Sequence, residues 1–228
     1  MKVKLISCSK PSREIYKDGI YDVKELIAYC AKVSNPSGQM NLETADRLLK
    51  YLIKHQHWSP FEMASACVEI ETTRDIARQI LRHRSFSFQE FSQRYADPTK
   101  ELEFVYREAR FQDEKNRQNS IKLDLRSEEQ RELNRMWVEK QRNLIAAAKE
   151  AYTWAVTNGI AKEQARAVLP EGNTMSRLYM SGTIRSFIHY IQLRSENGTQ
   201  LEHIEIAKAI AKVIKEIFPF ELINNENH

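Results

Sequence analysis

In the first third of the chain the hydrophobic pattern changes abruptly from the period of a strand to the period of a helix. Residues 64–71 alternate between apolar and polar side chains, which predicts a half-buried strand. Residues 73–81 follow at once, and their apolar members Ile76, Ile80 and Leu81 are spaced as on one face of a helix. The two periods side by side predict a fold that combines strands with helices.

The same patterns recur along the rest of the chain. Strands are expected at residues 1–8 and 102–106, and helices at 23–32, 42–55, 127–159, 182–192 and 199–218. Asn41 is the expected cap of the second of these helices, and Ser127 with Gln130 forms a capping box for the third. Pro219 is expected to stop the last helix, and the polar residues 108–126 to form a surface excursion.

Length and composition limit the class of protein. With 228 residues, of which 42% are hydrophobic, the chain is expected to be one soluble domain spanning 1–228. It lacks an apolar run of about 20 residues and a signal-peptide pattern, so a cytoplasmic protein without membrane contact is expected. Cys8, Cys30 and Cys67 have neither metal-ligand nor disulfide spacing, so they are expected to be reduced and buried, with no metal bound.

Residues 82–95 gather anion-binding and hydrogen-bonding side chains in one short stretch. The guanidinium groups of Arg82, Arg84 and Arg94 suit a phosphate, and the polar side chains between them suit a heterocyclic ring. Composition alone leaves a solvated basic helix end equally acceptable. The aromatic residues nearby, Phe86, Phe88, Phe91 and Tyr95, leave an RNA stacking platform as a second alternative. The net charge of only +4 argues against a dedicated nucleic-acid-binding protein.

The spacing of this stretch resembles the signature of the flavin-dependent thymidylate synthases. It reads Arg-His-Arg, two residues, Ser, four residues, Ser, one residue, Arg, from Arg82 to Arg94. Four further segments resemble the family in the same order along nearly the whole chain. They are Cys30–Ser34, His57–Glu62, Ala165–Pro170 and Thr183–Arg194.

The resemblance implies the site residues. Those expected to hold dUMP are Gln79, Arg82, Glu90, Phe91, Ser92, Gln93, Arg94, Arg166 and Arg194. Those expected to hold FAD are Ser34, His57, Ser59, Glu62, Arg82, His83, Arg84, Glu90, Thr183, Arg185 and His189. The resemblance also places Arg194 at the position of the family's catalytic arginine. Three positions depart from the common pattern: Met63 stands where many members have His, and Thr183 and His189 where many have Asn.

The resemblance also implies the reaction and the fold. The activity would be the reductive methylation of dUMP to dTMP, with methylenetetrahydrofolate as the one-carbon donor and NADPH-reduced FAD as the hydride source. The fold would be α+β, a mixed sheet with long helices in the thymidylate synthase-complementing arrangement. Members assemble as homotetramers with active sites shared between subunits.

Two arguments from the residues agree with this. In residues 182–192 the polar Arg185 and His189 lie four residues apart on the face opposite the apolar one, with Gly182 allowing close approach, which suits an anionic planar cofactor. A permanently charged guanidinium such as that of Arg194 can stabilise the charge that develops on a uracil ring when C5 becomes a nucleophile. None of the cysteines lies in a recognisable nucleophilic site, so covalent activation of the ring by a thiolate is not expected.

Overall fold

The computed structural model describes residues 1–220 and is built around a four-stranded sheet. Its strands lie in the order β1 (Lys2–Cys8), β2 (Ser65–Thr73), β6 (Met175–Thr183) and β3 (Ser87–Glu90). The α+β class is therefore confirmed, but every pairing in the sheet is antiparallel, so the expected mixed sheet is wrong. Strands β2 and β3, which are joined through α4, run in the same direction. They do not pair with each other, because β6 lies between them and runs antiparallel to both.

One face of the sheet is apolar and the other is polar. Val68 and Ile70 of β2 and Leu178 and Met180 of β6 point to the buried face, and none of them is exposed. On the opposite face Lys4 and Glu69 approach to 2.8 Å, and Arg177 pairs with Glu71 at 2.8 Å. The predicted alternation of residues 64–71 is thus confirmed, and the strand continues to Thr73.

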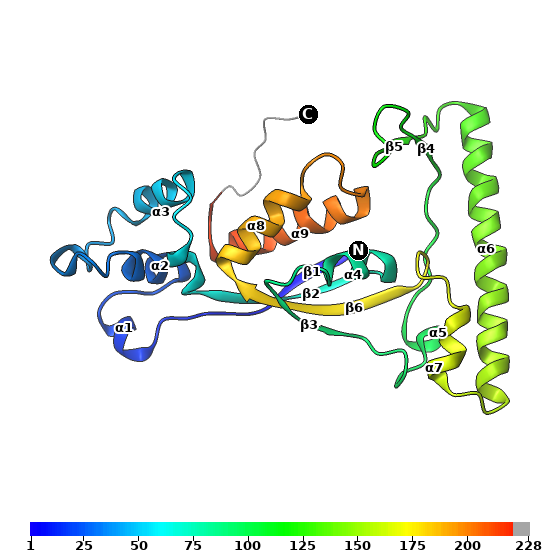
Figure 1. Cartoon of the computed structure of the whole chain (residues 1–228), viewed down its shortest axis with the longest axis horizontal. Helices are drawn as coiled ribbons and strands as arrows, with labels where there is room; N and C mark the ends of the chain where they lie inside the picture. Colours follow the sequence, from blue (N-terminus) through cyan, green and yellow to red (C-terminus); the bar gives the residue numbers. More distant parts are fainter. Residues whose placement is uncertain (221–228) are drawn as a thin grey trace.

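Three helices cover the apolar face of the sheet. They are α4 (Arg74–Ile80), α8 (Ile184–Arg194) and α9 (Leu201–Ile217), and Figure 1 shows α8 and α9 lying side by side over the strands. The predicted apolar face of α8 is confirmed, since Ile184, Phe187, Ile188 and Ile191 are all fully buried. Gly182, at the end of β6, admits a ring from its own chain: a Cβ there would lie 2.4 Å from Cδ1 of Phe86.

A small group of helices forms one end of the molecule, as Figure 1 shows. It consists of α1 (Arg13–Lys17), α2 (Val23–Ala31), the 3-10 turn η1 (Pro36–Gly38), α3 (Ala45–Lys54) and the 3-10 turn η2 (Ser59–Glu62). The expected cap at Asn41 is wrong, because α3 begins after Thr44 and the Asn41 carbonyl instead accepts a hydrogen bond from the Lys32 ammonium.

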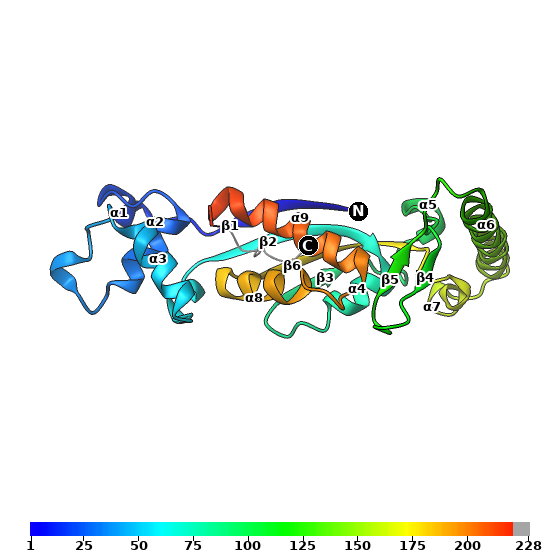
Figure 2. The ribbon, with the colours of Figure 1, turned by 90° about the horizontal axis from the view of Figure 1, so that it is seen from above.

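The opposite end is formed by the long helix α6 (Glu128–Thr157), which stands apart from the sheet in Figures 1 and 2. Around it lie α5 (Pro98–Glu101), the hairpin of β4 (Arg110–Gln112) with β5 (Ser120–Lys122), α7 (Lys162–Ala165) and the 3-10 turn η3 (Arg166–Val168). Ser127 caps α6 as predicted, but the capping box is incomplete because the Gln130 side chain accepts from the backbone of Asp124. A second, smaller core of Tyr152, Ala155, Ala165 and Leu169 joins α6 to α7 and η3.

The strand expected at residues 102–106 is wrong. Only Phe104 forms a bridge there, to Thr174. The ladder ends because a side chain replaces the partner strand: Gln141 of α6 accepts from the Arg107 backbone N–H at 2.9 Å and donates to its carbonyl at 2.8 Å.

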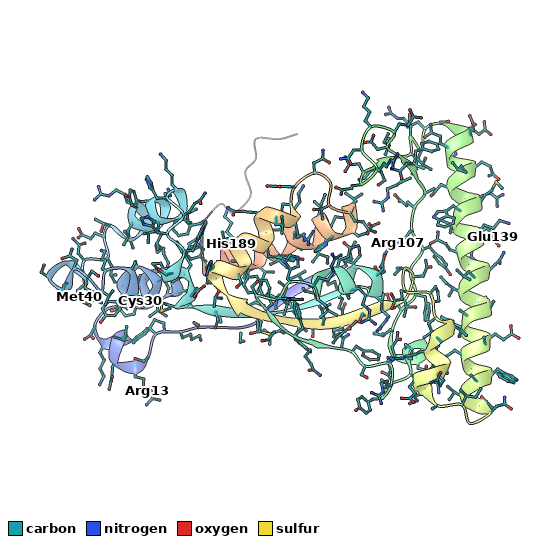
Figure 3. The ribbon with its side chains drawn as sticks, viewed as in Figure 1. Arg13, Cys30, Met40, Arg107, Glu139 and His189 are labelled. Carbon is teal, nitrogen blue, oxygen red and sulfur yellow. The ribbon has the colours of Figure 1, made fainter. Side chains whose placement is uncertain are left out.

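All three cysteines are free thiols, as expected, but each is partly exposed and not buried. Cys8 ends β1, Cys67 lies within β2, and Cys30 lies in α2, which Figure 3 shows in the helical end of the molecule. No helix within residues 1–220 is long and apolar enough to cross a membrane. Within the same residues no three metal-ligating side chains are grouped as a metal ion requires.

Candidate active site

The predicted catalytic arginine lies against the first signature motif. Arg194, at the end of α8, donates from Nε to Nε2 of His83 at 2.9 Å, although 111 positions separate them in the sequence. His83 follows α4, and its ring packs edge-on against Tyr190 with the centroids 4.9 Å apart. The helix that carries the arginine and the turn that carries the histidine are therefore held together by side chains of the site itself.

The contact requires a neutral imidazole. Burial, followed by the positive charges of Arg194 and Arg82, lowers the pKa of His83 from 6.5 to about 4. At neutral pH the ring thus keeps a bare Nε2 that accepts from the guanidinium. Because only one edge of a guanidinium is used by this bond, the remaining N–H groups of Arg194 stay available to a ligand.

Gln79 and a histidine that the sequence analysis did not single out lie behind this contact. His203 of α9 is fully buried, and its Nδ1 lies 3.1 Å from Oε1 of Gln79. Its Nε2 lies 2.9 Å from the hydroxyl of Tyr190. The available signal was its place in the apolar stripe of α9, since it falls in line with the buried Ile206 and Ile210.

Glu90, the last residue of β3, lies among several partners. Its Oε1 accepts from the Ser176 hydroxyl at 2.8 Å, and the guanidinium groups of Arg74 and Arg78 lie 3.6 and 4.0 Å from its carboxylate. Arg74 is 6% exposed, and burial lowers its pKa from the ordinary value. The sequence analysis missed Arg74 because the periodicity of α4 shows nothing unusual at its first residue.

The turn after β3 carries the second half of the signature. Ser92 and Arg94 lie in this turn, and the Arg94 guanidinium is 3.3 Å from Glu163 of α7. Arg166, three residues after Glu163, binds back to its carbonyl and forms no ion pair within residues 1–220. Gln93 is 3% exposed, and its Nε2 has no hydrogen-bond partner in the described part of the chain. Phe91, also expected here, is half-buried beside Glu90.

Part of the set expected to hold FAD forms a second surface near the helical end of the molecule, whereas Arg82, His83, Arg84 and Glu90 lie around α4 and β3. Glu62 of η2 pairs with Arg185 of α8, and His189 packs edge-on against Trp58 at 4.6 Å. Figure 3 shows His189 at the start of the helix layer, on the side facing α2 and α3. His57, Ser59 and Ser34 are exposed, whereas the Thr183 hydroxyl is already used to cap α8 at Ser186.

The structure therefore does not bring all the predicted residues into one enclosed pocket. They lie in three groups along the long axis: the surface around Arg185, the contact of Arg194 with His83, and the turn at Arg94. A cavity of ≈ 580 Å³ lies elsewhere, lined by residues such as Arg107, Arg110 and Glu202, and none of the predicted site residues borders it.

The structure also gives the surroundings of Met63, which departs from the family pattern, and of the aromatic residues considered for RNA stacking. Met63 is 54% exposed and ends η2. Of the four aromatic residues proposed for RNA stacking, Phe86 is buried and packs against Phe187 with the centroids 5.0 Å apart, so it presents no face to a base. Only Tyr95, at 83% exposure, stands fully in solvent.

Taken together, the fold and the site define an α+β protein with clustered, partly unpaired arginines on an antiparallel sheet and its covering helices. The sequence profile of the family described as "Thymidylate synthase complementing protein" matches residues 19–220. The chain belongs to this family, as the motifs predicted.

Two relatives are similar over nearly their whole length. The chain is 51% identical over 219 residues to a "Probable flavin-dependent thymidylate synthase" of Paramecium bursaria Chlorella virus 1, covering 96% of each chain. It is 46% identical over 221 residues to the "Flavin-dependent thymidylate synthase" of Synechocystis sp., again covering 96% of each.

A solved structure supports the fold. The crystal structure of a UMP/dUMP methylase, PolB from Streptomyces cacaoi, bound with 5-Br dUMP, superposes with a TM-score of 0.74 at 23% identity. The match covers 95% of this chain and 90% of that one, so the fold is shared over nearly the full length.

Proposed function

We propose that this protein is a flavin-dependent thymidylate synthase that converts dUMP to dTMP. The observation that carries the proposal is the contact of Arg194 with His83, because it joins the two most specific motifs of the chain at one point. The two relatives named as flavin-dependent thymidylate synthases, at 51% and 46% identity over nearly the full length, support the same activity.

The nucleotide would be held by groups suited to an anion and a polar ring. Arg94 and Arg166 both contact Glu163, Arg94 through its carboxylate and Arg166 through its carbonyl, and they would bind the phosphate with Ser92 and the unpartnered Nε2 of Gln93 as further donors. Arg82 is exposed and without an ion-pair partner within residues 1–220, so its charge is available. The pyrimidine would meet Gln79 and Arg194, with Glu90 and Phe91 completing the set.

Arg194 would activate the uracil ring of dUMP. Uracil C5 can attack the one-carbon unit only after the ring has become electron-rich, and the negative charge of that activated ring is shared by its nitrogens and carbonyl oxygens. A guanidinium fixed on one edge by neutral His83 presents its other N–H groups without reorganising, which is the requirement for electrostatic stabilisation of a transition state. The thiols are not suited to activate the ring, since burial raises the pKa of Cys30 and Cys67.

The residues expected to hold FAD, on the second surface and beside the contact of Arg194 with His83, fit a flavin. Arg82, Arg84 and Arg185 supply cationic donors, and His57, Ser59, Ser34 and His189 supply further hydrogen-bonding groups, which matches a planar cofactor that carries a diphosphate. Glu62, Glu90, His83 and Thr183 complete the proposed FAD contacts. When bound, FAD reduced by NADPH would supply the hydride, and methylenetetrahydrofolate the one-carbon unit.

The spread of the site along the molecule supports a shared active site in an oligomer. The three groups of residues lie apart from one another in one chain, so a second copy could complete each of them. Helix α6 also exposes large apolar side chains, among them Trp137 at 45% and Trp154 at 63%. We extend the proposal to a homotetramer of this chain, acting in the cytoplasm.

The first experiment is an absorbance spectrum of the purified protein, followed by NADPH oxidation with and without dUMP. We expect bound flavin, and NADPH consumption that accelerates with dUMP and yields dTMP when methylenetetrahydrofolate is present. A protein that takes up no added FAD and consumes no NADPH would contradict the proposal. If that protein bound RNA instead, the stacking-platform alternative would replace it.

A further inference from the structure

A series of hydrogen bonds with a fixed direction runs from Glu202 of α9 to the Gln79 side chain of α4. It begins at Glu202, which is held by Arg110 at 2.5 Å. Gln200 Nε2 donates to Oε2 of Glu202 at 3.0 Å, and Gln79 Nε2 donates to Oε1 of Gln200 at 2.7 Å. His203 Nδ1 then lies 3.1 Å from Oε1 of Gln79.

The charge of Glu202 sets the direction of every bond in this chain. A carboxylate only accepts, so Gln200 must turn its NH₂ group toward Glu202 and its carbonyl toward Gln79. Gln79 must then turn its own NH₂ group toward Gln200, which leaves its carbonyl facing His203. The imidazole meets that carbonyl with Nδ1–H, and its bare Nε2 accepts from the Tyr190 hydroxyl at 2.9 Å.

This series of hydrogen bonds leaves the Gln79 side chain with one free hydrogen-bond donor and one free acceptor. An amide offers two N–H donors and two carbonyl lone pairs, and one of each is used by Gln200 and His203. One donor and one acceptor remain, and they cannot exchange places unless the whole chain reverses. His203 is fully buried and Tyr190 is 1% exposed, so water does not readily supply substitute partners.

This polarity distinguishes the two pyrimidines. Uracil presents a carbonyl acceptor at C4 beside an N–H donor at N3, whereas cytosine presents an amino donor at C4 beside an acceptor at N3. An amide that pairs with one edge must rotate by half a turn to pair with the other.

We infer that Gln200 and His203 are positioning residues that fix the orientation of the Gln79 amide and so make the nucleotide site select uracil over cytosine. The inference rests on the proposed function, because it takes Gln79 to face the base of dUMP. Neither residue was among the predicted site residues, and each acts through Gln79.

The test compares the affinities for dUMP and dCMP, measured by calorimetry on the full-length, FAD-loaded protein. In Gln200→Lys a donor replaces the carbonyl that faces Gln79, while the pairing with Glu202 is kept. The Gln79 amide is then expected to turn over, with Nδ1 of His203 accepting from it and Nε2–H donating to Tyr190. We expect the ratio of dUMP to dCMP affinity to fall by about fivefold or more, the scale of one bidentate base contact.

Because dUMP and dCMP carry the same phosphate, the positive charge that Gln200→Lys adds affects both affinities alike and cancels in their ratio. His203→Leu removes the donor to Gln79 and should lower the ratio in the same direction, whereas His203→Asn keeps an N–H near the position of Nδ1 and should retain it. Glu205→Gln, an exposed change on the same helix, is the matched control and should leave the ratio unaltered.

The outcomes separate the inference from the proposed function. A parent protein that prefers dUMP, with Gln200→Lys retaining the same preference, overturns the inference and leaves the function standing. A parent protein that binds neither nucleotide overturns the proposed function. Gln200 is partly exposed, so this variant remains informative even if the buried change at His203 prevents folding.

Discussion

At the scale of single residues, the bond from Arg194 Nε to His83 Nε2 divides the arginine into an anchored edge and a free edge. The anchored edge is turned toward the helix layer, where Tyr190 and His203 pack against the same histidine. The position of the guanidinium is therefore fixed before any substrate binds. This is the property expected of a group that acts on a transition state and not mainly on binding.

Replacing Arg194 with Ala is expected to lower turnover by about a hundredfold or more, the scale of a lost electrostatic stabiliser. Arg94→Ala is the contrasting variant. It should mainly raise the KM for dUMP, because a phosphate contact is made equally in the ground and transition states. Steady-state kinetics of dTMP formation checks both, and near-normal turnover in Arg194→Ala would show that the assigned role is wrong.

The two histidines behind the site predict a loss of stability in acid. Burial, with the charge of Arg194 as a second cause, lowers the pKa of His203 from 6.5 to about 3, and the pKa of His83 falls to about 4. Below pH 6.5 the unfolded chain takes up protons at these rings while the folded chain does not, so stability falls as the pH drops toward 4 and 3.

For His203 alone the slope is up to about 1.4 kcal/mol per pH unit. Urea unfolding of the parent and of His203→Asn between pH 7 and pH 4 measures it. The parent is more stable at pH 7, and its advantage should shrink as the pH falls. If the free energies of unfolding of the parent and the variant changed in parallel with pH, His203 would titrate alike in the folded and unfolded chains.

The cysteines are expected to be dispensable for catalysis. Burial raises the pKa of Cys30 and Cys67, which disfavours the thiolate that a nucleophile requires. Replacing Cys8, Cys30 and Cys67 together by Ser should leave dTMP formation within a few-fold of the parent, with packing losses of about 1 kcal/mol per site. If the folded, FAD-loaded triple variant made no product, covalent cysteine catalysis would have to replace the proposed mechanism.

At the scale of elements, a buried polar side chain adds to the contacts that connect the long helix α6 to the rest of the molecule. Gln141 is 3% exposed and satisfies the backbone N–H and carbonyl of Arg107, and it also accepts from Nδ2 of Asn173 at 2.8 Å. Because Arg107 in turn pairs with Asp75 at 2.7 Å, α6 is linked through it to the helix α4 that precedes the signature motif.

Replacing Gln141 with Leu keeps the volume but removes the partner of the Arg107 backbone N–H and carbonyl, and one of the two acceptors of Asn173 Nδ2. We expect a loss of about 2–4 kcal/mol in the free energy of unfolding, since each unsatisfied buried group costs about 1–3 kcal/mol and water recovers part of it. Lys140→Leu, at an exposed neighbouring position, is the control and should change stability by less than about 0.5 kcal/mol. Equal effects in denaturant unfolding would contradict the assigned role of Gln141.

At the scale of the whole molecule, the elongated shape leaves much of α6 uncovered. Only five of its 30 residues are buried, while Met136, Trp137 and Leu144 are each at least 45% exposed. A helix that stands at one end of a chain with apolar side chains in solvent is typical of an interface. The separation of the three site groups within one chain is consistent with the same interpretation.

Placing a charge at Trp137 is expected to break this interface. In Trp137→Glu the oligomer should dissociate in analytical ultracentrifugation, with thermal unfolding of the subunit changed little and dTMP formation reduced at least tenfold if sites are shared, since isolated subunits lack part of each site. Arg135→Glu, an exposed polar change on the same helix, is the control. A Trp137→Glu protein that stays assembled and active would show that α6 faces solvent.

The sequence by itself determined the family and most of the elements. Local spacing predicted a strand at residues 64–71, where the structure has β2 at Ser65–Thr73, and a helix with one face buried by Ile184 to Ile191, because periodicity is a property of neighbouring residues. The motif from Arg82 to Arg94 indicated the family, and the profile match to residues 19–220 confirmed it. The roles of the individual site residues stay predictions.

Only the tertiary structure decided which distant groups meet. The antiparallel insertion of β6 between β2 and β3 replaced the expected mixed sheet, and Gln141 ended the strand expected at 102–106 by binding the Arg107 backbone. The contacts of Arg194 with His83 and of His203 with Gln79 join residues more than 100 positions apart. Their partners are chosen by the packing of helices on a sheet, and no local pattern in the sequence contains that information.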